Sequence, residues 1–448
     1  MVQRRAVIVG GGAAGAWLAW MLAARGVHGI DIVDPGDLGR GLAYSAPSPA
    51  HLLNVPAHRM DMATAPGEPM FADWLVRSRP GATREDYVPR WRYGDFLGEL
   101  MSGLQASGAL RHRRTRATAV SRDGDRFQVS LADGGAIDAP AVVLAVGNLA
   151  PVRLAPGVAH ERILENPWAL PQGPARDAGD VLVAGTGLTA LDAVAAIASA
   201  SPSARFVLAA RRPYVPPIDH VDETCPGLER LVGLPPSLVW REAMATIRAR
   251  GAPDGWKGVV DSMKKLTEPV WLRWTPRQRA SFMRHGVRHW LQHRHRAPPP
   301  TSRLVDRLRS EGRLLVKAGR VTDLVPGPSG VSARVGGEAM TVDLVVNATG
   351  PSLDIRRHDL LARLLEAGLL ARCPLGLGID VDARSLSRAA GGPVPGLYVL
   401  GPLTRGAFFE VVAVPHFQGK ARAIADAIAC GAQAGSTPAA LPSKASAL

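Results

Sequence analysis

The sequence has few cysteines and no long apolar run. Its three cysteines, Cys225, Cys373 and Cys430, stand far apart among 448 residues, and none belongs to a Cys-x-x-Cys pair. This spacing excludes a zinc ribbon, a secreted disulfide framework and a dithiol redox centre, and it favours a reducing, cytoplasmic setting. No stretch of about 18 apolar residues occurs, so we expect no membrane-spanning helix. The first expected strand begins too close to the start for a signal peptide, and we expect none.

The composition is otherwise that of an ordinary globular protein. Hydrophobic residues make up 46% of the chain and charged residues 21%, which excludes wholesale disorder. The length suggests about three domains at roughly 150 residues each. A chain of this size buries enough apolar surface to fold without disulfides.

Positive charge exceeds negative charge, and most of the excess lies in one segment. The formal net charge is +14, and residues 271–320 contain thirteen Lys or Arg and only two acids. Such a segment can bind nucleic acid, guide a small anion toward a cleft, or form a solvated helix face. The motifs described below are those of a metabolic enzyme, so nucleic-acid binding is the least favoured of the three.

The apolar pattern predicts an α/β protein that contains a repeated unit. Helices are expected at 13–25, 188–200 and 415–429, and a strand, a glycine turn and a helix occur twice, at Gly10 and at Gly185. Alternating runs at 110–140 and 313–334 predict small antiparallel sheets. Apolar runs typical of buried parallel strands lie at 5–9, 29–33, 141–147, 180–184, 205–209, 342–350 and 397–401.

Two further segments differ in character from the repeated unit. Residues 214–300 interrupt its second copy with helical patterning and five tryptophans, of which Trp271, Trp274 and Trp290 are expected to form the core of a helical insert. Residues 432–448 are rich in Ala, Ser, Pro and Gly and predict a loose C-terminal tail.

The first glycine turn, Gly10-Gly-Gly-Ala-Ala-Gly15, matches the dinucleotide pattern G-x-G-x-x-G between a strand and a helix. Gly10 would allow the tight turn, Gly12 would let the backbone approach a pyrophosphate, and Gly15 would let helix and strand pack closely. Ala14 lies in the first turn of the helix, whose free N–H groups favour a phosphate. Asp34 ends the next strand and would accept hydrogen bonds from a ribose.

The second turn is looser. Gly185 and Gly187 occupy the first two glycine positions, and Thr189 lies in the first helical turn. The following strand ends at Arg211 and Arg212 instead of at an acid. Arginine pairs with the 2′-phosphate of NADP, so this turn favours NADPH over NADH. A pair of surface arginines without a ligand is the alternative.

Four more positions are candidates for contact with a dinucleotide. Gly147 and Gly350 each follow a buried strand, where a backbone could cross beside a bound cofactor. Gly401 precedes the last expected helix and Pro415 begins it, and the N-terminus of this helix would stabilise negative charge on a reduced flavin ring.

With these motifs in place, the chain resembles the flavoproteins that have two dinucleotide-binding domains, with FAD in the first and NAD(P)H in the second. More narrowly, it is similar to a bacterial group that includes flavin-dependent urate hydroxylase and aspartate N-monooxygenase. The resemblance covers about residues 3–430, although Ala190 stands where the second turn would have its third glycine. It is carried by segments 41–45, 51–57, 71–75, 88–96, 284–285, 293–296, 401–406 and 413–415, and by Met60, Arg211 and Arg212 with His220, and Glu410.

The resemblance implies an α/β fold with two Rossmann-like domains and a helical insert, similar to class B flavin monooxygenases. We expect an FAD-binding domain at 1–175 and 321–430, and an NAD(P)H-binding domain at 176–320 with its insert at 214–300. The implied activity is hydroxylation of a small, polar, anionic, nitrogen-containing metabolite through a flavin hydroperoxide, with FAD, NADPH or NADH, and molecular oxygen. A urate-type substrate is favoured, and aspartate-type N-oxygenation of an amino acid is the close alternative.

Candidate residues for the chemistry lie outside the glycine turns. Asn54 could contact the flavin ring through its amide, which donates and accepts hydrogen bonds, or it could stabilise a turn. A metal site is not expected, because the clustered histidines are flanked by arginines and lack acidic partners. The candidates are Asn54, Tyr44 and His220 for catalysis, and His285, Arg294 and Arg296 for binding an anionic substrate.

Two other functional classes stay open from the sequence alone. One is a flavin reductase or dehydrogenase that passes electrons on without oxygenating a substrate. The other is a nucleotide-sensing binding module, which would be colourless when purified. The sequence does not distinguish the substrate, the oxygenated atom or the oligomeric state.

Overall fold

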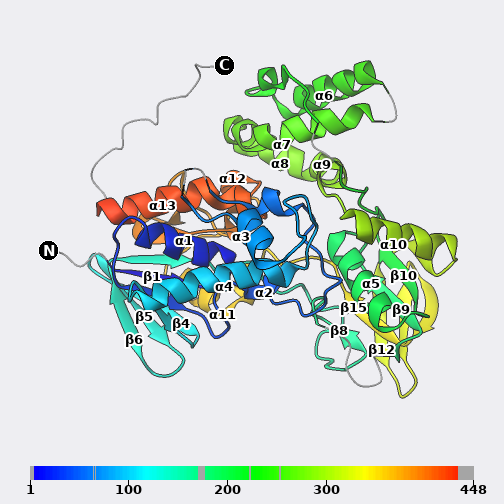
Figure 1. Cartoon of the computed structure of the whole chain (residues 1–448), viewed down its shortest axis with the longest axis horizontal. Coiled ribbons are helices and arrows are strands. Elements are labelled where there is room, and N and C mark those ends of the chain that lie inside the picture. Colours follow the sequence, from blue (N-terminus) through cyan, green and yellow to red (C-terminus); the bar gives the residue numbers. More distant parts are fainter. Residues whose placement is uncertain are drawn as a thin grey trace.

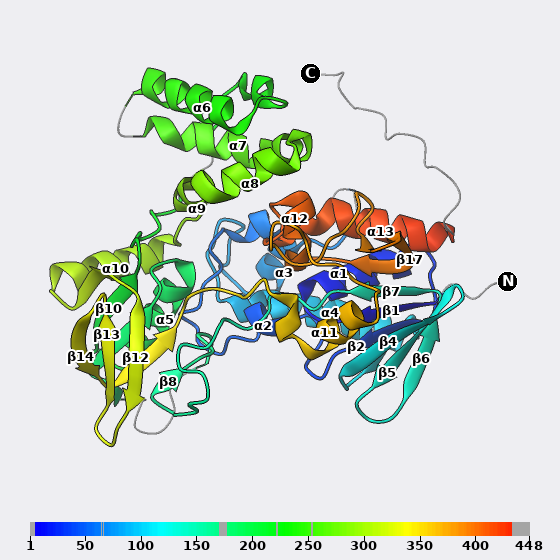
Figure 2. The same cartoon turned by 180° about the vertical axis from the view of Figure 1, so that it is seen from behind.

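The computed structural model describes residues 5–63, 65, 67–169, 177–220, 223–251 and 254–431. The predicted loose tail at 432–448 and the predicted domain boundary at 175 lie outside these described residues. Two parallel sheets lie side by side, and a group of helices projects above them (Figure 1). A three-stranded antiparallel sheet accompanies each parallel sheet, and these smaller sheets lie at opposite ends of the molecule (Figure 2).

The first parallel sheet is built around the first glycine turn. Its order is β16-β17-β7-β1-β2-β3, and only the edge strand β16 runs antiparallel to its neighbour. β1 and β7 are buried along their whole length, as expected for central strands covered on both faces. The strands are β1 (Ala6–Val9), β2 (Ile30–Val33), β3 (Leu110–Arg113), β7 (Ala141–Leu144), β16 (Leu386–Ala389) and β17 (Gly392–Val399).

Helices cover one face of this sheet and an antiparallel sheet covers the other. On the helical face, α1 (Ala13–Ala23) packs between α4 (Arg90–Ala106) and α13 (Gln418–Cys430). The same side holds α2 (Gly41–Tyr44), η1 (Ala57–Met60) and α3 (Phe71–Ser78). The opposite face packs against β4 (Ala117–Asp123), β5 (Arg126–Leu131), β6 (Ala136–Ala139), η4 (Ile355–Arg357) and α11 (Asp359–Glu366).

The second parallel sheet repeats this plan around the second glycine turn. Its order is β11-β10-β9-β15-β8, with every neighbouring pair parallel. α5 (Leu188–Ala200) and α10 (Pro299–Ser310) cover one face, and β12 (Val321–Pro326), β13 (Val331–Val335) and β14 (Glu338–Val342) cover the other. The strands are β8 (Ile163–Leu164), β9 (Asp180–Ala184), β10 (Arg205–Ala210), β11 (Leu314–Ala318) and β15 (Leu344–Asn347).

Two alternating runs are placed differently from the prediction. The pattern predicts antiparallel strands around Leu110 and Leu314, but β3 and β11 pair parallel with β2 and β10. Each is the third strand of a β-α-β-α-β unit, and the crossover helix brings it back to the edge of the parallel sheet. An edge strand is buried less completely by the helices and strands around it than a central strand is. Its apolar and polar residues can therefore alternate even though it pairs parallel with its neighbour.

The point at which the chain returns from the second domain to the first also differs from the prediction. We expected the first domain to resume at residue 321. Instead, β15 pairs with β9, and the antiparallel sheet β12–β14 packs on the same second sheet. The chain therefore leaves the second sheet only after Asn347. The short strand β8 joins that sheet from the other side of the boundary, by pairing with β15.

The segment between β10 and α10 forms the projecting group of helices in Figure 1. Its core contains Trp271 and Trp274, as predicted, while Trp290 is only partly buried against it. Trp271 also stacks on Phe409, with ring centroids 4.8 Å apart, and so joins the insert to the segment that follows β17. The elements are η3 (Leu228–Leu231), α6 (Pro236–Arg250), α7 (Gly255–Arg273), α8 (Pro276–His285) and α9 (Val287–Arg294).

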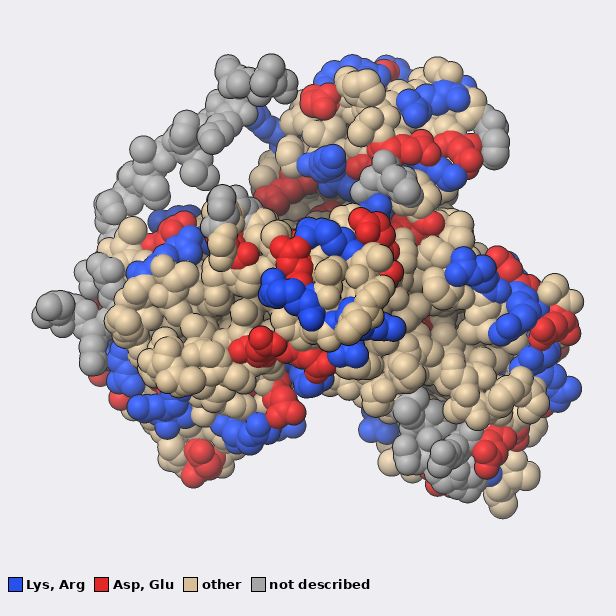
Figure 3. All heavy atoms as spheres, viewed as in Figure 1, with Lys and Arg blue, Asp and Glu red and all other residues tan. Residues whose placement is uncertain are grey.

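The basic segment 271–320 is spread over α7 to β11, and acids from elsewhere neutralise part of it. Arg294 pairs with Glu410, Arg296 with Asp261, and Lys317 with Glu338. Over the face shown in Figure 3, basic and acidic side chains are interspersed. Within the described residues, no helix combines the length and apolar character that a bilayer span requires.

Candidate functional site

The first glycine turn is closed so tightly that two of its positions accept only glycine. Gly10 has a φ of +109°, and a Cβ there would lie 2.3 Å from the carbonyl oxygen of Ala145 on the neighbouring strand connection. A Cβ on Gly15 would lie 2.0 Å from the carbonyl oxygen of Gly10. These contacts press the start of α1 against the end of β1, which is the packing expected at a dinucleotide-binding turn.

Gly12 differs because the space beside it is open. Its nearest neighbour for an added Cβ is the Cα of Gly41, at 3.5 Å. Gly12 is also the N-cap of α1 and no side chain caps the helix, so the first N–H groups are available to an anion. Gly401 lies on the same side, where its Cβ would be 3.9 Å from that of Ala14. The structure thus brings Gly12, Ala14 and Gly401 together as a cradle that fits a pyrophosphate.

Asp34 is held in place beside this turn. The N–H of Gly11 donates to its Oδ2 and the N–H of Gly36 to its Oδ1, both at 2.7 Å. Each carboxylate oxygen has a second lone pair, so the side chain keeps the capacity to accept a ribose hydroxyl. That role is still a prediction.

The second turn has the same geometry as the first. Gly185 has a φ of +136°, and its Cβ would lie 2.3 Å from the carbonyl oxygen of Ala348, as that of Gly10 would from Ala145. Gly147 and Gly350 follow these two contacts, and both have a positive φ, +71° and +91°. Two equivalent backbone crossings therefore flank the two turns, one in each sheet.

The predicted NADPH residues lie around the second turn. α5 starts after Gly187 without a side-chain cap, and Thr189 is half-buried in its first turn. The N–H of Tyr214 donates to Oγ1 of Thr186, which ties this turn to the segment after β10. Arg211 and Arg212 directly follow β10 and are exposed to solvent, and neither forms an ion pair with another described residue. They are free to meet an added phosphate.

Tyr44 and Asn54 occupy different surroundings in the loop region after β2. The ring of Tyr44 packs on Tyr93, with centroids 4.9 Å apart, and burial raises the pKa of Tyr44 to about 12. Tyr44 is therefore a neutral phenol at physiological pH and cannot act as a general base there. Asn54 is half-buried and makes no side-chain hydrogen bond to another described residue, so its amide is available to a ligand.

A buried group at the junction of the two sheets received no role from the sequence. His51 is fully buried, and neither of its ring nitrogens has a hydrogen-bond partner in the described structure. Its ring meets Trp168 edge-on, and the Arg90 guanidinium lies over the same indole at 4.9 Å. Arg90 donates to the buried carboxylate of Asp192 on α5 at 2.9 Å, which joins the two domains. The sequence offered only the resemblance of segments 51–57 and 88–96 as a signal.

The buried imidazole of His51 makes stability depend on pH. Burial, and next the charge of Arg90, lower its pKa from 6.5 to about 4. Between these values the unfolded chain binds a proton that the folded protein does not, so stability falls as the pH falls. We expect this one group to lower the free energy of unfolding by about 2 kcal/mol between pH 7.5 and pH 5. Urea titrations should show a loss that is smaller by this amount in His51→Leu than in the parent, because the buried His295 and His416 contribute to the loss in both.

A matched control for this prediction is His28→Leu, because His28 is exposed. It should keep the pH dependence of the parent. Equal loss of stability in His51→Leu and in the parent would contradict the assignment of this pH dependence to His51.

The predicted residues His220 and Arg296 belong to a buried ion-pair network at the base of the insert. Nη2 of Arg296 donates to Asp261 at 2.6 Å, and Nε2 of His220 lies 3.1 Å from the same carboxylate. Lys264 pairs with it as well, at 2.7 Å. Burial opposes ionisation of Asp261, but Arg296 and Lys264 outweigh it and hold its pKa at about 2. Arg296 is 3% exposed and thus serves this network instead of facing solvent.

Arg294 lies in a second cluster, and His285 lies in neither. Nε of Arg294 is 3.5 Å from Oε2 of Glu410, and its Nη2 is 3.3 Å from Nε2 of His416. The indole N–H of Trp290 donates to Oε1 of Glu410 at 2.8 Å. His285 is exposed at the end of α8 and makes no hydrogen bond or ion pair with another described residue. The structure therefore does not bring the three predicted substrate residues together.

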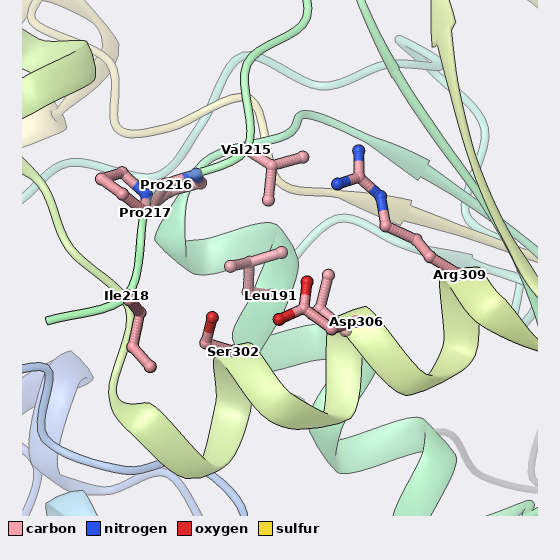
Figure 4. A pocket seen from close by; sticks show the side chains of 9 residues that line it. Leu191, Val215, Pro216, Pro217, Ile218, Ser302, Asp306 and Arg309 are labelled. Atoms are coloured by element: carbon pink, nitrogen blue, oxygen red, sulfur yellow. The ribbon is translucent and has the colours of Figure 1, made fainter. Parts of the chain in front are cut away.

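A groove beside α5 is separate from these sites. It has a volume of about 270 Å³ and lies between α5, α10 and the segment 215–218 (Figure 4). Leu191, Val215 and Ile218 form part of its apolar wall, and Asp306 and Arg309 stand on α10. None of the predicted site residues lines it.

Comparison with known proteins agrees with this architecture. Residues 7–149, which include the first glycine turn, match the family model described as FAD-NAD(P)-binding. The search of curated proteins finds no match.

Solved structures with a similar fold include enzymes of two kinds. One is the ornithine N-hydroxylase of Kutzneria sp. 744 in complex with reduced FAD, NADP+ and L-ornithine, which is 16% identical in sequence and has a TM-score of 0.65. The alignment covers 94% of this chain and 98% of the hydroxylase chain. The ornithine hydroxylase of Pseudomonas aeruginosa is also 16% identical, with a TM-score of 0.63 and coverage of 95% and 98%. The bacillithiol disulfide reductase of Bacillus cereus, 16% identical, has a TM-score of 0.57 and coverage of 96% and 99%. At this identity the similarity shows a shared fold.

Proposed function

We propose that the chain is a monooxygenase that uses FAD and NADPH to oxygenate a small, polar, anionic, nitrogen-containing metabolite. The observation that carries the proposal is the pair of equivalent turns, Gly10 against Ala145 and Gly185 against Ala348, in one chain. Two dinucleotide sites allow a nicotinamide cofactor to reduce a flavin. The three cysteines are all free, which argues against a dithiol relay within the chain.

The residues of the first domain fit FAD. Gly12, Ala14 and the uncapped start of α1 would hold its pyrophosphate, and Asp34 would hold the ribose of its adenosine half. Asn54 has an amide free to meet the flavin ring, and Gly401 lies against α1 at the end of the same sheet. When bound, FAD supplies hydride acceptance and the activation of oxygen; the protein positions the reactants and excludes water.

The residues of the second domain would select the nicotinamide cofactor. Gly187 and Thr189 at the start of α5 would hold its pyrophosphate, and the exposed Arg211 and Arg212 would pair with a 2′-phosphate. Arg90 and Asp192 hold this domain beside the first one. The resulting preference for NADPH is part of the proposal.

Two substrate classes remain candidates. The resemblance in sequence favours a urate-type reaction. Oxygenation of the nitrogen of an amino acid is the second candidate, and the solved structures of ornithine hydroxylases with this fold support it. The lysine 6-monooxygenase of Pseudomonas syringae, with a TM-score of 0.57 at 16% identity, gives similar support.

The proposal is tested by purifying the protein, recording its visible spectrum, and measuring NADPH-coupled oxygen uptake. We expect a yellow protein whose oxygen uptake rises with one of urate, L-aspartate, L-ornithine or L-lysine and yields an oxygenated product. Peroxide formed in equal amount to the NADPH consumed, with every substrate, would instead indicate a reductase or oxidase. A colourless protein that takes up no flavin would refute the proposal.

A further inference from the structure

The cluster around Glu410 contains buried hydrogen-bond donors that no described residue satisfies. We define the Glu410 cluster as Arg294, His295, Arg405, Glu410 and His416. Within it, Nε of Arg294, Nε of Arg405 and Nδ1 of His416 are buried without a hydrogen-bond partner.

Glu410 is close to two of these donors but does not bond to them. Its Oε2 is 3.5 Å from Nε of Arg294 and 3.8 Å from Nδ1 of His416, which is too long for hydrogen bonds of normal strength. Buried polar groups are nearly always hydrogen-bonded, so unused donors of this kind indicate a missing acceptor.

The charges of the cluster favour an anion as that acceptor. Arg294 and Arg405 contribute two positive charges against the single negative charge of Glu410. Burial, followed by the charge of Arg294, lowers the pKa of His295 and of His416 to about 4, so both imidazoles are neutral at physiological pH. The tautomer of His416 follows from its contacts, because its Nε2 accepts from Arg294 and its Nδ1 then carries the proton.

The members of the cluster converge on one place. Arg294 lies 3.5 Å from Glu410 and 3.3 Å from His416, and Arg405 is joined to Glu410 by the short backbone hydrogen bonds around Phe408 and Phe409. The ring of His295 makes no hydrogen bond to another described residue. Arg294 and His295 come from the end of α9, whereas Arg405 begins α12 (Arg405–Phe408) and His416 lies in η6 (Val414–Phe417).

A strained turn sets the position of Glu410 relative to Arg405. Phe409 has a φ of +61° and a ψ of −64°, and the N–H of Glu410 donates to the carbonyl of Phe408 at 2.8 Å. This is a γ-turn of the rare, high-energy kind, which persists only where the surroundings enforce it. The stacking of Phe409 on Trp271 enforces it here. Such strain is concentrated at functional sites, so it is an independent observation that points to the same cluster.

We propose that Arg294, Arg405 and the Nδ1–H of His416 bind an oxyanion of the substrate, such as a carboxylate, and that Glu410 is the fixed counter-charge that holds these donors in place. The inference rests on the proposed function only in naming the ligand as the substrate. It moves the expected anion contact away from Arg296, which is bound to Asp261. It also gives a role to Arg405 and Glu410, which the sequence offered only as part of the resemblance, and to His416, which the sequence did not indicate. The same segment, from Gly401 to Pro415, is the one expected beside the flavin.

Isothermal titration of the oxidised, FAD-loaded protein without NADPH tests the inference. The probes are L-aspartate, urate and malonate, with malonamide as the uncharged counterpart of malonate. We expect at least one anion to bind, and malonamide not to bind. Arg405→Met and Arg294→Met should each weaken anion binding by about 10-fold or more, since each removes a charge-assisted hydrogen bond.

Glu410→Gln provides a test of opposite sign. Its amide oxygen can still accept from Trp290 while the negative charge is lost, so anion binding should strengthen by about 3-fold or more. Arg277→Met is the matched control, because Arg277 is an exposed arginine of the same insert, and it should leave the affinity within about twofold. Arg405→Lys keeps the charge but not the donor geometry and should weaken binding less than Arg405→Met, which keeps the test valid if the methionine variant misfolds.

Three results would overturn the inference. The first is that none of the three anions binds at millimolar concentration. The second is that Arg405→Met and the parent bind the anion with equal affinity. The third is that Arg405→Met and Glu410→Gln change the affinity for the anion in the same direction. Anion binding is measured without turnover, so its failure is distinct from a failure of NADPH-coupled oxygenation. Binding with the expected variant pattern but without oxygenation would refute the proposed function and leave the anion site standing.

Discussion

Replacing Gly12 by alanine is expected to give a folded protein that has lost most of its flavin. An alanine Cβ would lie 3.5 Å from the Cα of Gly41, so the protein itself accommodates it. The same Cβ would stand in the cradle where a pyrophosphate approaches the backbone. Overpacking of about 1–3 kcal/mol would weaken the binding of FAD by about 5- to 150-fold. The flavin retained on purification and the affinity for added FAD measure the effect, with circular dichroism to confirm folding.

Two other glycine variants serve as controls for Gly12→Ala. Gly103→Ala lies in α4 with no atom within 4 Å of its added Cβ, and it should bind flavin like the parent. Gly15→Ala would place its Cβ 2.0 Å from a carbonyl oxygen, so it should disrupt the turn and the fold together. Normal flavin content in Gly12→Ala would show that the pyrophosphate does not lie over this turn.

Reversing the charges of Arg211 and Arg212 is expected to abolish most of the preference for NADPH. In Arg211→Glu/Arg212→Glu, two charge-assisted bonds of about 1.5–3 kcal/mol each are lost and replaced by repulsion of the 2′-phosphate. The KM for NADPH should therefore rise by about 100-fold or more. NADH has no 2′-phosphate, so its KM should change by no more than about threefold. Steady-state kinetics with each cofactor measures the difference.

The control for this variant must carry the same change in net charge. Arg303→Glu/Arg309→Glu meets this condition, because both arginines are exposed on α10 of the second domain and not on the segment that follows β10. It should leave both KM values close to those of the parent. An equal rise of the two KM values in Arg211→Glu/Arg212→Glu would remove the phosphate-pairing argument.

The strands that meet the glycine turns could be predicted from the sequence because their signals are local. Apolar runs of four or five residues that end at Gly10 and Gly185, each followed by an Ala- and Leu-rich helix, specify a strand, a turn and a helix without reference to the rest of the chain. Local sequence led to a wrong prediction for β3 and β11, which were expected to be antiparallel. An edge strand of a parallel sheet and an antiparallel strand can share one alternating pattern of apolar residues. The partner strand, which lies far away in the sequence, distinguishes them.

The candidate substrate site could be predicted even less well from local sequence. The sequence indicated Arg294, Arg296 and His285 as one set because they are basic and close in the chain. In the structure, Arg296 is neutralised by Asp261, His285 is exposed, and only Arg294 faces Glu410 and His416, more than 110 residues away. Whether an arginine is available to a ligand depends on which acids the fold brings beside it, and local sequence does not contain that information.

What the sequence by itself determined is thus the chemistry of the two turns, since only glycine permits the backbone angles and close contacts found at Gly10 and Gly185. Only the tertiary structure decided that Ala145 and Ala348 close these turns, that His51 is buried at the junction of the domains, and that unsatisfied donors surround Glu410. These features arise from contacts between distant segments, and the burial that such contacts produce sets the charge and the hydrogen-bonding capacity of each group.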